Sequence, residues 1–157
     1  MNAVPAPADP AAGHGGAAPA SAAGEPRLRI ALYSDKSTTR DKVRRAVGRR
    51  PAADLPLVQM EDYATLPALL RAVDAGGFDV IVLDGEAAPA GGLGVCRQLK
   101  DEIFDCPPVL VLTGRPQDAW LAAWSKAEAA VPHPLDPRAL ADAVASLARR
   151  RAGSPPA

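Results

Sequence analysis

The sequence predicts an α/β fold built on a parallel β-sheet, and two observations carry this prediction. Residues 80–83 (Val-Ile-Val-Leu) form an uninterrupted apolar run that ends on Asp84, and such a run is typical of a strand buried on both faces of a parallel sheet. Short apolar segments also alternate with helical patterns five times along the chain. Regular strand–helix alternation predicts a doubly wound sheet that is covered by helices on both faces.

The first two strand–helix units lie in the first half of the chain. Leu28 to Tyr33 is predicted as the first strand, and a helix should follow from about Ser37, which is a candidate N-cap. Leu55 to Met60 is predicted as a second, weaker strand. The helix after it carries Leu66 on its apolar face and ends at Gly76-Gly77, because glycine commonly terminates helices.

The third and fourth units follow the same order. Asp79 to Leu83 is predicted as the third strand, with its helix from about Leu93 to Ile103. Pro108 to Leu112 is predicted as the fourth strand and is followed by a helix from about Gln117 to Ala127. Ala129 to Val131 is expected to form a short fifth strand.

The last helix is expected to begin near Asp136-Pro137, because an N-cap residue followed by proline suits the start of a helix. Among small proteins with five such units, the commonest arrangement is the flavodoxin-like sheet with strand order 2-1-3-4-5. Right-handed crossovers then place the first and last helices on one face of the sheet and the middle three on the other.

Composition sets the domain organisation. Ala, Pro and Gly dominate residues 1–26, and residues 152–157 are similar, so both segments are expected to be disordered. Residues 27–151 are then left for one compact domain. The first segment lacks the basic start and the Leu-rich apolar run of a signal peptide. No apolar run approaches the length that a membrane span requires.

Charge and cysteine content narrow the possible functions. Lys and Arg together number 18, as do Asp and Glu, so the net charge is zero and no general affinity for nucleic acids is implied. Cys96 and Cys106 lack the spacing of metal ligands. We therefore expect reduced, buried cysteines in a cytoplasmic protein.

Polar residues follow four of the predicted strands: Ser34-Asp35, Asp84, Thr113-Gly114 and His133-Pro134. The carboxyl ends of parallel strands share one edge of the sheet, where open α/β proteins place their ligand sites. Two converging carboxylates suit Mg²⁺, and the Thr113 hydroxyl with a cationic side chain would hold the oxygens of a phosphoryl group on Asp84. From this pattern alone, the alternative that Asp84 merely opens the next turn stays open.

With these motifs in order, residues 27–150 resemble the receiver domain of bacterial response regulators. Ser34-Asp35 resembles the acidic-pair loop, Leu83-Asp84 the phosphoacceptor strand, Thr113-Gly114 the Ser/Thr-small signature, and His133-Pro134 the Lys-Pro segment. The resemblance implies that Asp84 is the phosphoacceptor. It also implies that Asp35, Asp84 and the backbone carbonyl of Glu86 bind Mg²⁺, and that the His133-Pro134 peptide bond is cis. It implies a signalling domain and no enzyme.

The Asp-Gly-Glu-Ala and Pro-His-Pro segments are shared with stand-alone actinobacterial receivers. That likeness implies a stand-alone receiver in a two-component phosphorelay, with a histidine kinase as phosphodonor and an output through protein contact. It also implies respiratory complex I as a candidate partner. In receivers the partner surface is formed by the fourth helix, the fifth strand and the fifth helix. Trp120 and Trp124 lie one turn apart on that fourth helix, where core packing and interface contact remain alternatives.

Three residues depart from the family pattern. Ser34 stands at the first acidic position, which should weaken Mg²⁺ binding. His133 stands at the lysine position with a shorter side chain, and Ala130 stands at the position of the aromatic residue that reports phosphorylation. These departures support a second function, that of a degenerate pseudo-receiver that binds a larger complex without phosphorylation.

Charged side chains give two further expectations. Glu86 and Arg115 each lie two residues after a site residue, so we expect them to form a salt bridge that partly covers Asp84. Basic residues also crowd the first helix and end the last one, and both a solvated helix face and docking on an acidic protein surface explain them. These residues are Arg40, Lys42, Arg44, Arg45, Arg49, Arg50 and Arg149-Arg150-Arg151.

Overall fold

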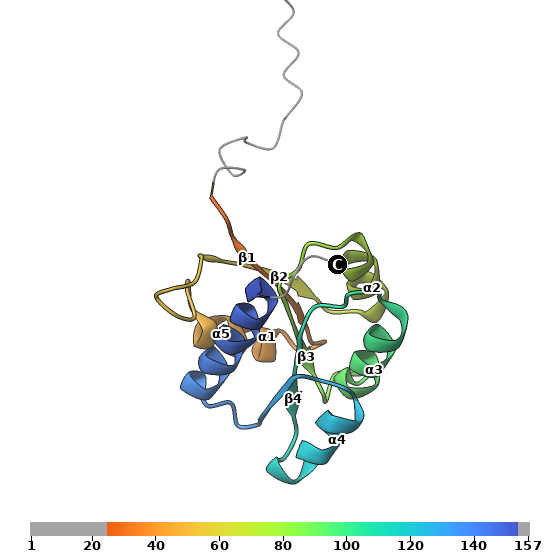
Figure 1. Cartoon of the computed structure of the whole chain (residues 1–157). Coiled ribbons are helices and arrows are strands. Elements are labelled where there is room, and N and C mark those ends of the chain that lie inside the picture. The colour runs from red at the N-terminus through yellow and green to blue at the C-terminus, as the bar shows by residue number, and fades with distance from the viewer. Residues whose placement is uncertain (1–24, 154–157) are drawn as a thin grey trace, which may run out of the picture.

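The computed structural model describes residues 25–153, which contain a five-stranded parallel sheet (Figure 1). The strand order is β2-β1-β3-β4-β5, which confirms the predicted flavodoxin-like arrangement. Residues 1–24 and 154–157 of the two segments expected to be disordered lie outside the described residues. Ala152 and Gly153 are the last two residues of a helix, so the expectation of disorder is wrong for them. The strands are β1 (Leu28–Tyr33), β2 (Val58–Tyr63), β3 (Val80–Asp84), β4 (Val109–Thr113) and β5 (Ala129–Pro132).

Helices cover both faces of the sheet. The helices α1 (Ser37–Val47) and α5 (Pro137–Gly153) lie side by side on one face (Figure 1). The other face is covered by α2 (Leu66–Ala75) and α3 (Gly92–Glu102). A short α4 (Ala119–Trp124) packs against α3, β4 and β5. The first and last helices therefore share a face, as the right-handed crossovers predicted.

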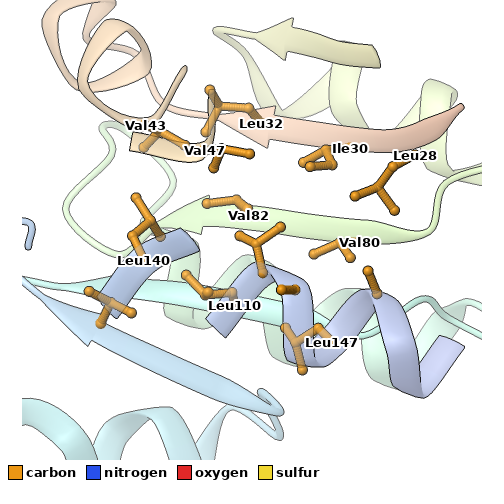
Figure 2. Close-up of a cluster of buried hydrophobic side chains, with 14 of the residues drawn as sticks. Leu28, Ile30, Leu32, Val43, Val47, Val80, Val82, Leu110, Leu140 and Leu147 are labelled. Atoms are coloured by element: carbon orange, nitrogen blue, oxygen red, sulfur yellow. The ribbon is translucent and has the colours of Figure 1, made fainter. Parts of the chain in front are cut away.

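The sheet divides the core into two layers, because successive residues of a strand point to opposite faces. Ile30 and Leu32 of β1 pack with α1 and α5, whereas Ala31 and Tyr33 pack with α2 and α3. All five residues of β3 are buried, as expected of the central strand. Figure 2 shows the first layer, to which α1 and α5 contribute Val43, Val47, Leu140 and Leu147.

The second strand begins three residues later than predicted. The chain turns at Leu55, whose N–H donates to the Ala52 carbonyl (3.1 Å), and β2 starts at Val58 opposite the first residue of β1. The strand then continues through Glu61 and Asp62. These carboxylates are tolerated because arginines from other elements pair with them, and a pattern of apolar residues alone does not reveal such partners.

The fourth helix is shorter than the predicted 117–127. A 3-10 turn (Pro116–Asp118) precedes α4, and the helix ends because Lys126 adopts a left-handed conformation with φ of 67°. The Ser125 hydroxyl donates to the Ala122 carbonyl (2.7 Å) and so satisfies an acceptor in the last turn. The element was therefore predicted correctly in type and place, but not in length.

Candidate functional site

The register of the strands brings the predicted polar residues to one edge of the sheet. Asp84 at the end of β3 lies opposite Leu112, and Thr113 at the end of β4 lies opposite Pro132. The N–H of His133 donates to the Thr113 carbonyl (2.8 Å), which fixes the start of the loop after β5. The expected cis peptide bond between His133 and Pro134 is present.

Asp84 is buried, with 1% of its surface exposed, and its carboxylate is held on several sides. Its Oδ2 accepts a hydrogen bond from the Ser34 hydroxyl (2.8 Å), and its Oδ1 accepts one from the Glu86 backbone N–H (2.9 Å). The His133 Nε2 lies 4.0 Å from the same Oδ1. The Glu86 N–H bond is the contact that a turn-opening aspartate makes. The Ser34 hydroxyl comes from a separate loop and also orients the carboxylate, which a residue that only opens a turn does not need.

Ser34 links Asp84 to the loop after β1. This buried hydroxyl donates to Asp84 and accepts the backbone N–H of Lys36 (3.1 Å). The Ser34 carbonyl accepts a hydrogen bond from Arg40 Nη1 (2.7 Å). A neutral hydroxyl thus lies beside the Asp84 carboxylate, and it avoids the repulsion that a second carboxylate would cause there.

Asp35 and Tyr33 join the loop after β1 to the loop after β3. Asp35 is exposed, and its Oδ1 accepts the Ala88 N–H (3.2 Å). The buried Tyr33 hydroxyl donates to the Ala90 carbonyl (2.6 Å). Burial raises the pKa of Tyr33, and the negative charges of Asp35 and then Asp84 raise it further. Tyr33 was predicted only as the last residue of the first strand, because a strand pattern does not show that a hydroxyl contacts a distant loop.

A glycine permits the close approach of α3 to the end of β3. A Cβ atom on Gly92 would lie 2.5 Å from the Asp84 carbonyl oxygen, which is closer than real contacts allow. Because Gly92 is the first residue of α3, a side chain here would push the helix away from the end of β3.

The donors at this edge suit a weakly held Mg²⁺. Within residues 25–153, no three His, Cys, Asp or Glu side chains are grouped to hold a metal by themselves. Mg²⁺ needs only one or two carboxylates, because it keeps several of its waters. Asp35, Asp84 and the Glu86 carbonyl are all hard oxygen donors of the kind that it prefers.

The predicted salt bridge between Glu86 and Arg115 is wrong. The Arg115 guanidinium pairs instead with Asp118 three residues along the chain (3.1 Å between Nη2 and Oδ1). The Glu86 carboxylate lies over Gly114, where a Cβ atom would be only 2.2 Å from its Oε1. The 3-10 turn supplies a nearer carboxylate for Arg115 than the neighbouring loop does, so the two residues do not pair across the site.

Both tryptophans of α4 are exposed. Trp120 has 67% of its surface exposed and Trp124 has 50%, so core packing is excluded for both rings. The Arg97 guanidinium from α3 lies 4.8 Å from the centre of the Trp124 ring, and its Nη1 donates to the Trp124 carbonyl (2.8 Å). Ala130 on the adjacent β5 is exposed as well.

Comparison with known proteins shows which protein family the chain belongs to. The chain is 57% identical, over 122 residues, to a response regulatory protein of Mycobacterium tuberculosis whose role is uncharacterised; the match covers 78% of this chain and 92% of that protein. The corresponding protein of a second strain gives the same values. The chain belongs to the response regulators. No protein-family model matches it.

Solved receiver domains share the fold of this response regulator. The receiver domain of the Francisella response regulator 1452 superposes with a TM-score of 0.67 at 14% identity, covering 78% of this chain and 98% of that one. A CheY-like receiver protein from Methanospirillum hungatei gives a TM-score of 0.64 at 16% identity, covering 81% and 98%. The beryllofluoride-activated DrrB receiver domain gives 0.64 at 22% identity, covering 80% and 100%.

At these identities the solved structures show the fold alone. As a response regulator with this fold, the chain carries a receiver domain of two-component signalling. Within residues 25–153, none of the helices combines the length and the hydropathy that crossing a bilayer requires. None of these relatives is named as part of respiratory complex I, so that association stays a prediction.

Proposed function

We propose that this response regulator is a phosphotransfer receiver in which Asp84 accepts the phosphoryl group and partner binding delivers the output. The observation that carries the proposal is the buried Asp84 carboxylate, held by the Ser34 hydroxyl and the Glu86 N–H and faced by His133. A carboxylate oriented in this way, at the edge of the sheet where open α/β proteins bind ligands, supports the role of nucleophile for Asp84.

In the proposed transfer, a carboxylate oxygen of Asp84 attacks the phosphorus of a phosphohistidine on a kinase. The phosphorus–nitrogen bond breaks, and its electron pair leaves with the histidine. The Thr113 hydroxyl and the His133 imidazole would donate hydrogen bonds to the phosphoryl oxygens. Mg²⁺ held by Asp35, Asp84 and the Glu86 carbonyl would neutralise the charge that develops on those oxygens.

A phosphorylation-independent binding module is the second candidate. Ala130 favours it, because a methyl group cannot make the rotamer change by which an aromatic ring would report the state of Asp84. The exposed Trp120 and Trp124 favour it as well, because tryptophan often dominates interface energies. In both functions the proposed partner surface is α4, β5 and α5, and a histidine kinase is one candidate partner.

The experiment that tests the first function is incubation with acetyl phosphate and Mg²⁺, followed by intact mass measurement. The wild type should gain one phosphoryl group, and Asp84→Asn should gain none. Asp74→Asn is the matched control, because Asp74 is an exposed carboxylate on α2. Equal phosphorylation of wild type and Asp84→Asn would remove Asp84 as acceptor, and no phosphorylation of any variant would favour the second function.

A further inference from the structure

A groove between α1 and β2 lies far from the proposed phosphorylation site. We call it the α1–β2 groove; its volume is about 320 Å³, and it is lined by Arg44, Arg45, Gly48, Arg49, Val58 and Met60. Val58 is the first residue of β2, and it lies opposite the first residue of β1. Because the sheet is parallel, the groove is near the amino ends of the strands, whereas Asp84 is at a carboxyl end.

The rim of the groove carries positive charge that the described part of the chain does not neutralise. Arg44 is paired with Asp62. Within residues 25–153, neither Arg45 nor Arg49 has a carboxylate at salt-bridge distance, and both are exposed. The overall charge of the chain is zero, so this concentration of cations on one side of α1 is local.

The floor of the groove is apolar. Val58 and Met60 are partly buried and extend the core layer beneath α1. A cationic rim above an apolar floor matches a partner that offers carboxylates and aliphatic side chains together. Among the described residues 25–153, no aromatic side chain lines the groove, so this part of the chain offers no platform on which a nucleic acid base could stack. The combination favours a protein segment as the occupant.

We infer that the α1–β2 groove docks an acidic, amphipathic segment of a partner protein, with carboxylates on Arg45 and Arg49 and an aliphatic side chain over Val58 and Met60. Its position at the opposite end of the sheet from Asp84 makes this docking independent of phosphorylation. Within residues 25–153, no residue of α4, β5 or α5 lines the groove, although Arg45 also lines a neighbouring hollow with Pro137 at the start of α5. The protein would therefore have a second contact surface for partners on the β2 side of α1.

The test is fluorescence anisotropy of the full chain with a short labelled peptide that alternates glutamate and leucine, at low salt and without a phosphodonor. The wild type should bind this peptide more tightly than one that alternates glutamate and serine. Arg45→Gln combined with Arg49→Gln should weaken binding about fivefold or more, because two ion pairs are lost. The matched control is Arg71→Gln combined with Arg138→Gln, which removes the same charge from exposed sites outside the groove.

Several results would overturn the inference. These are no binding by the wild type, equal weakening in the control pair, or equal affinity for the glutamate–serine peptide. Competition by a single-stranded oligonucleotide at equal concentration would point to a nucleic acid instead. Asp84→Asn should bind the peptide as the wild type does, so failure of the proposed phosphotransfer and failure of the groove are separate outcomes. Circular dichroism confirms that each variant is folded.

Discussion

At the scale of single residues, Ser34 determines the charge next to Asp84 in the proposed acceptor site. Its hydroxyl satisfies Asp84 Oδ2 without adding charge, so the site does not depend on a cation to separate two neighbouring carboxylates. We therefore expect this site to bind Mg²⁺ more weakly than a site built on an acidic pair would.

Changing Ser34→Asp should raise the affinity for Mg²⁺ by about tenfold, because the added carboxylate is a further charged oxygen ligand. The same variant should melt at a lower temperature than the wild type in EDTA and recover when Mg²⁺ is added, since two close carboxylates repel until a cation lies between them. Isothermal titration and thermal denaturation measure the two effects. Ser37→Asp, at an exposed position on α1, is the control. An unchanged affinity in Ser34→Asp would show that the pocket does not bind the ion.

Cys96 gives a prediction for pH. This thiol is fully buried, and burial raises its pKa to about 11. The reactive thiolate is therefore suppressed in the folded protein at pH values well below 11, whereas an unfolded thiol ionises near its ordinary pKa. Alkylation of Cys96 by iodoacetamide at pH 8 should be slow in the native protein and fast in urea. Rapid native labelling of Cys96, resolved from the half-buried Cys106 by peptide mapping, would contradict the packing of α3.

At the scale of elements, α4 is a short helix whose large side chains face away from the core. Sequence patterns placed a helix here but did not decide which way Trp120 and Trp124 point, because six helical residues are too few for an apolar face to stand out. The same difficulty affected β2, whose polar Glu61 and Asp62 depend on arginines that are distant in the sequence. Both elements lie toward the edges of the fold.

Because both rings of α4 are exposed, removing them should change the free energy of unfolding only slightly and should weaken partner binding strongly. Trp120→Ala should change the free energy of unfolding by about 0.5 kcal/mol or less, as is usual for an exposed side chain. Trp124→Ala should cost about 0.5–1 kcal/mol through the lost contact with Arg97. Urea denaturation measures both. The double variant should weaken capture of the native partner more than Asp84→Asn does, and a stronger effect from Asp84→Asn would argue for phosphorylation-controlled binding.

At the scale of the whole molecule, the fold could be predicted because buried strands and amphipathic helices repeat in a regular order. The buried strand that ends on Asp84 could also be predicted. So could the positions of Thr113 and His133, because parallel strands bring their carboxyl ends to one edge of the sheet. What could not be predicted were pairings between loops. Arg115 pairs with Asp118 and not with Glu86. Both carboxylates are within the reach of this arginine along the sequence, and only the folded geometry distinguishes them.

The packing of α5 against the sheet should make the dominant contribution to the free energy of unfolding. Leu140 is fully buried in the layer that α1 and α5 share with the central strands (Figure 2). Leu140→Ala should therefore lower the free energy of unfolding by about 2–5 kcal/mol, through lost burial and the cavity that remains. Leu93→Ala, at a partly buried position on α3, should cost less. A similar loss in both variants by urea denaturation would mean that α5 is not a central part of the core.

Chemical mapping of the phosphorylated residue tests phosphotransfer to Asp84 without relying on a variant. After incubation with acetyl phosphate and Mg²⁺, borohydride reduces an aspartyl phosphate to an alcohol, and tandem mass spectrometry locates the modified position. We expect a single modified residue, Asp84, and no modification when Mg²⁺ or the phosphodonor is left out. Modification at Asp35 or another carboxylate, with Asp84 intact, would contradict it.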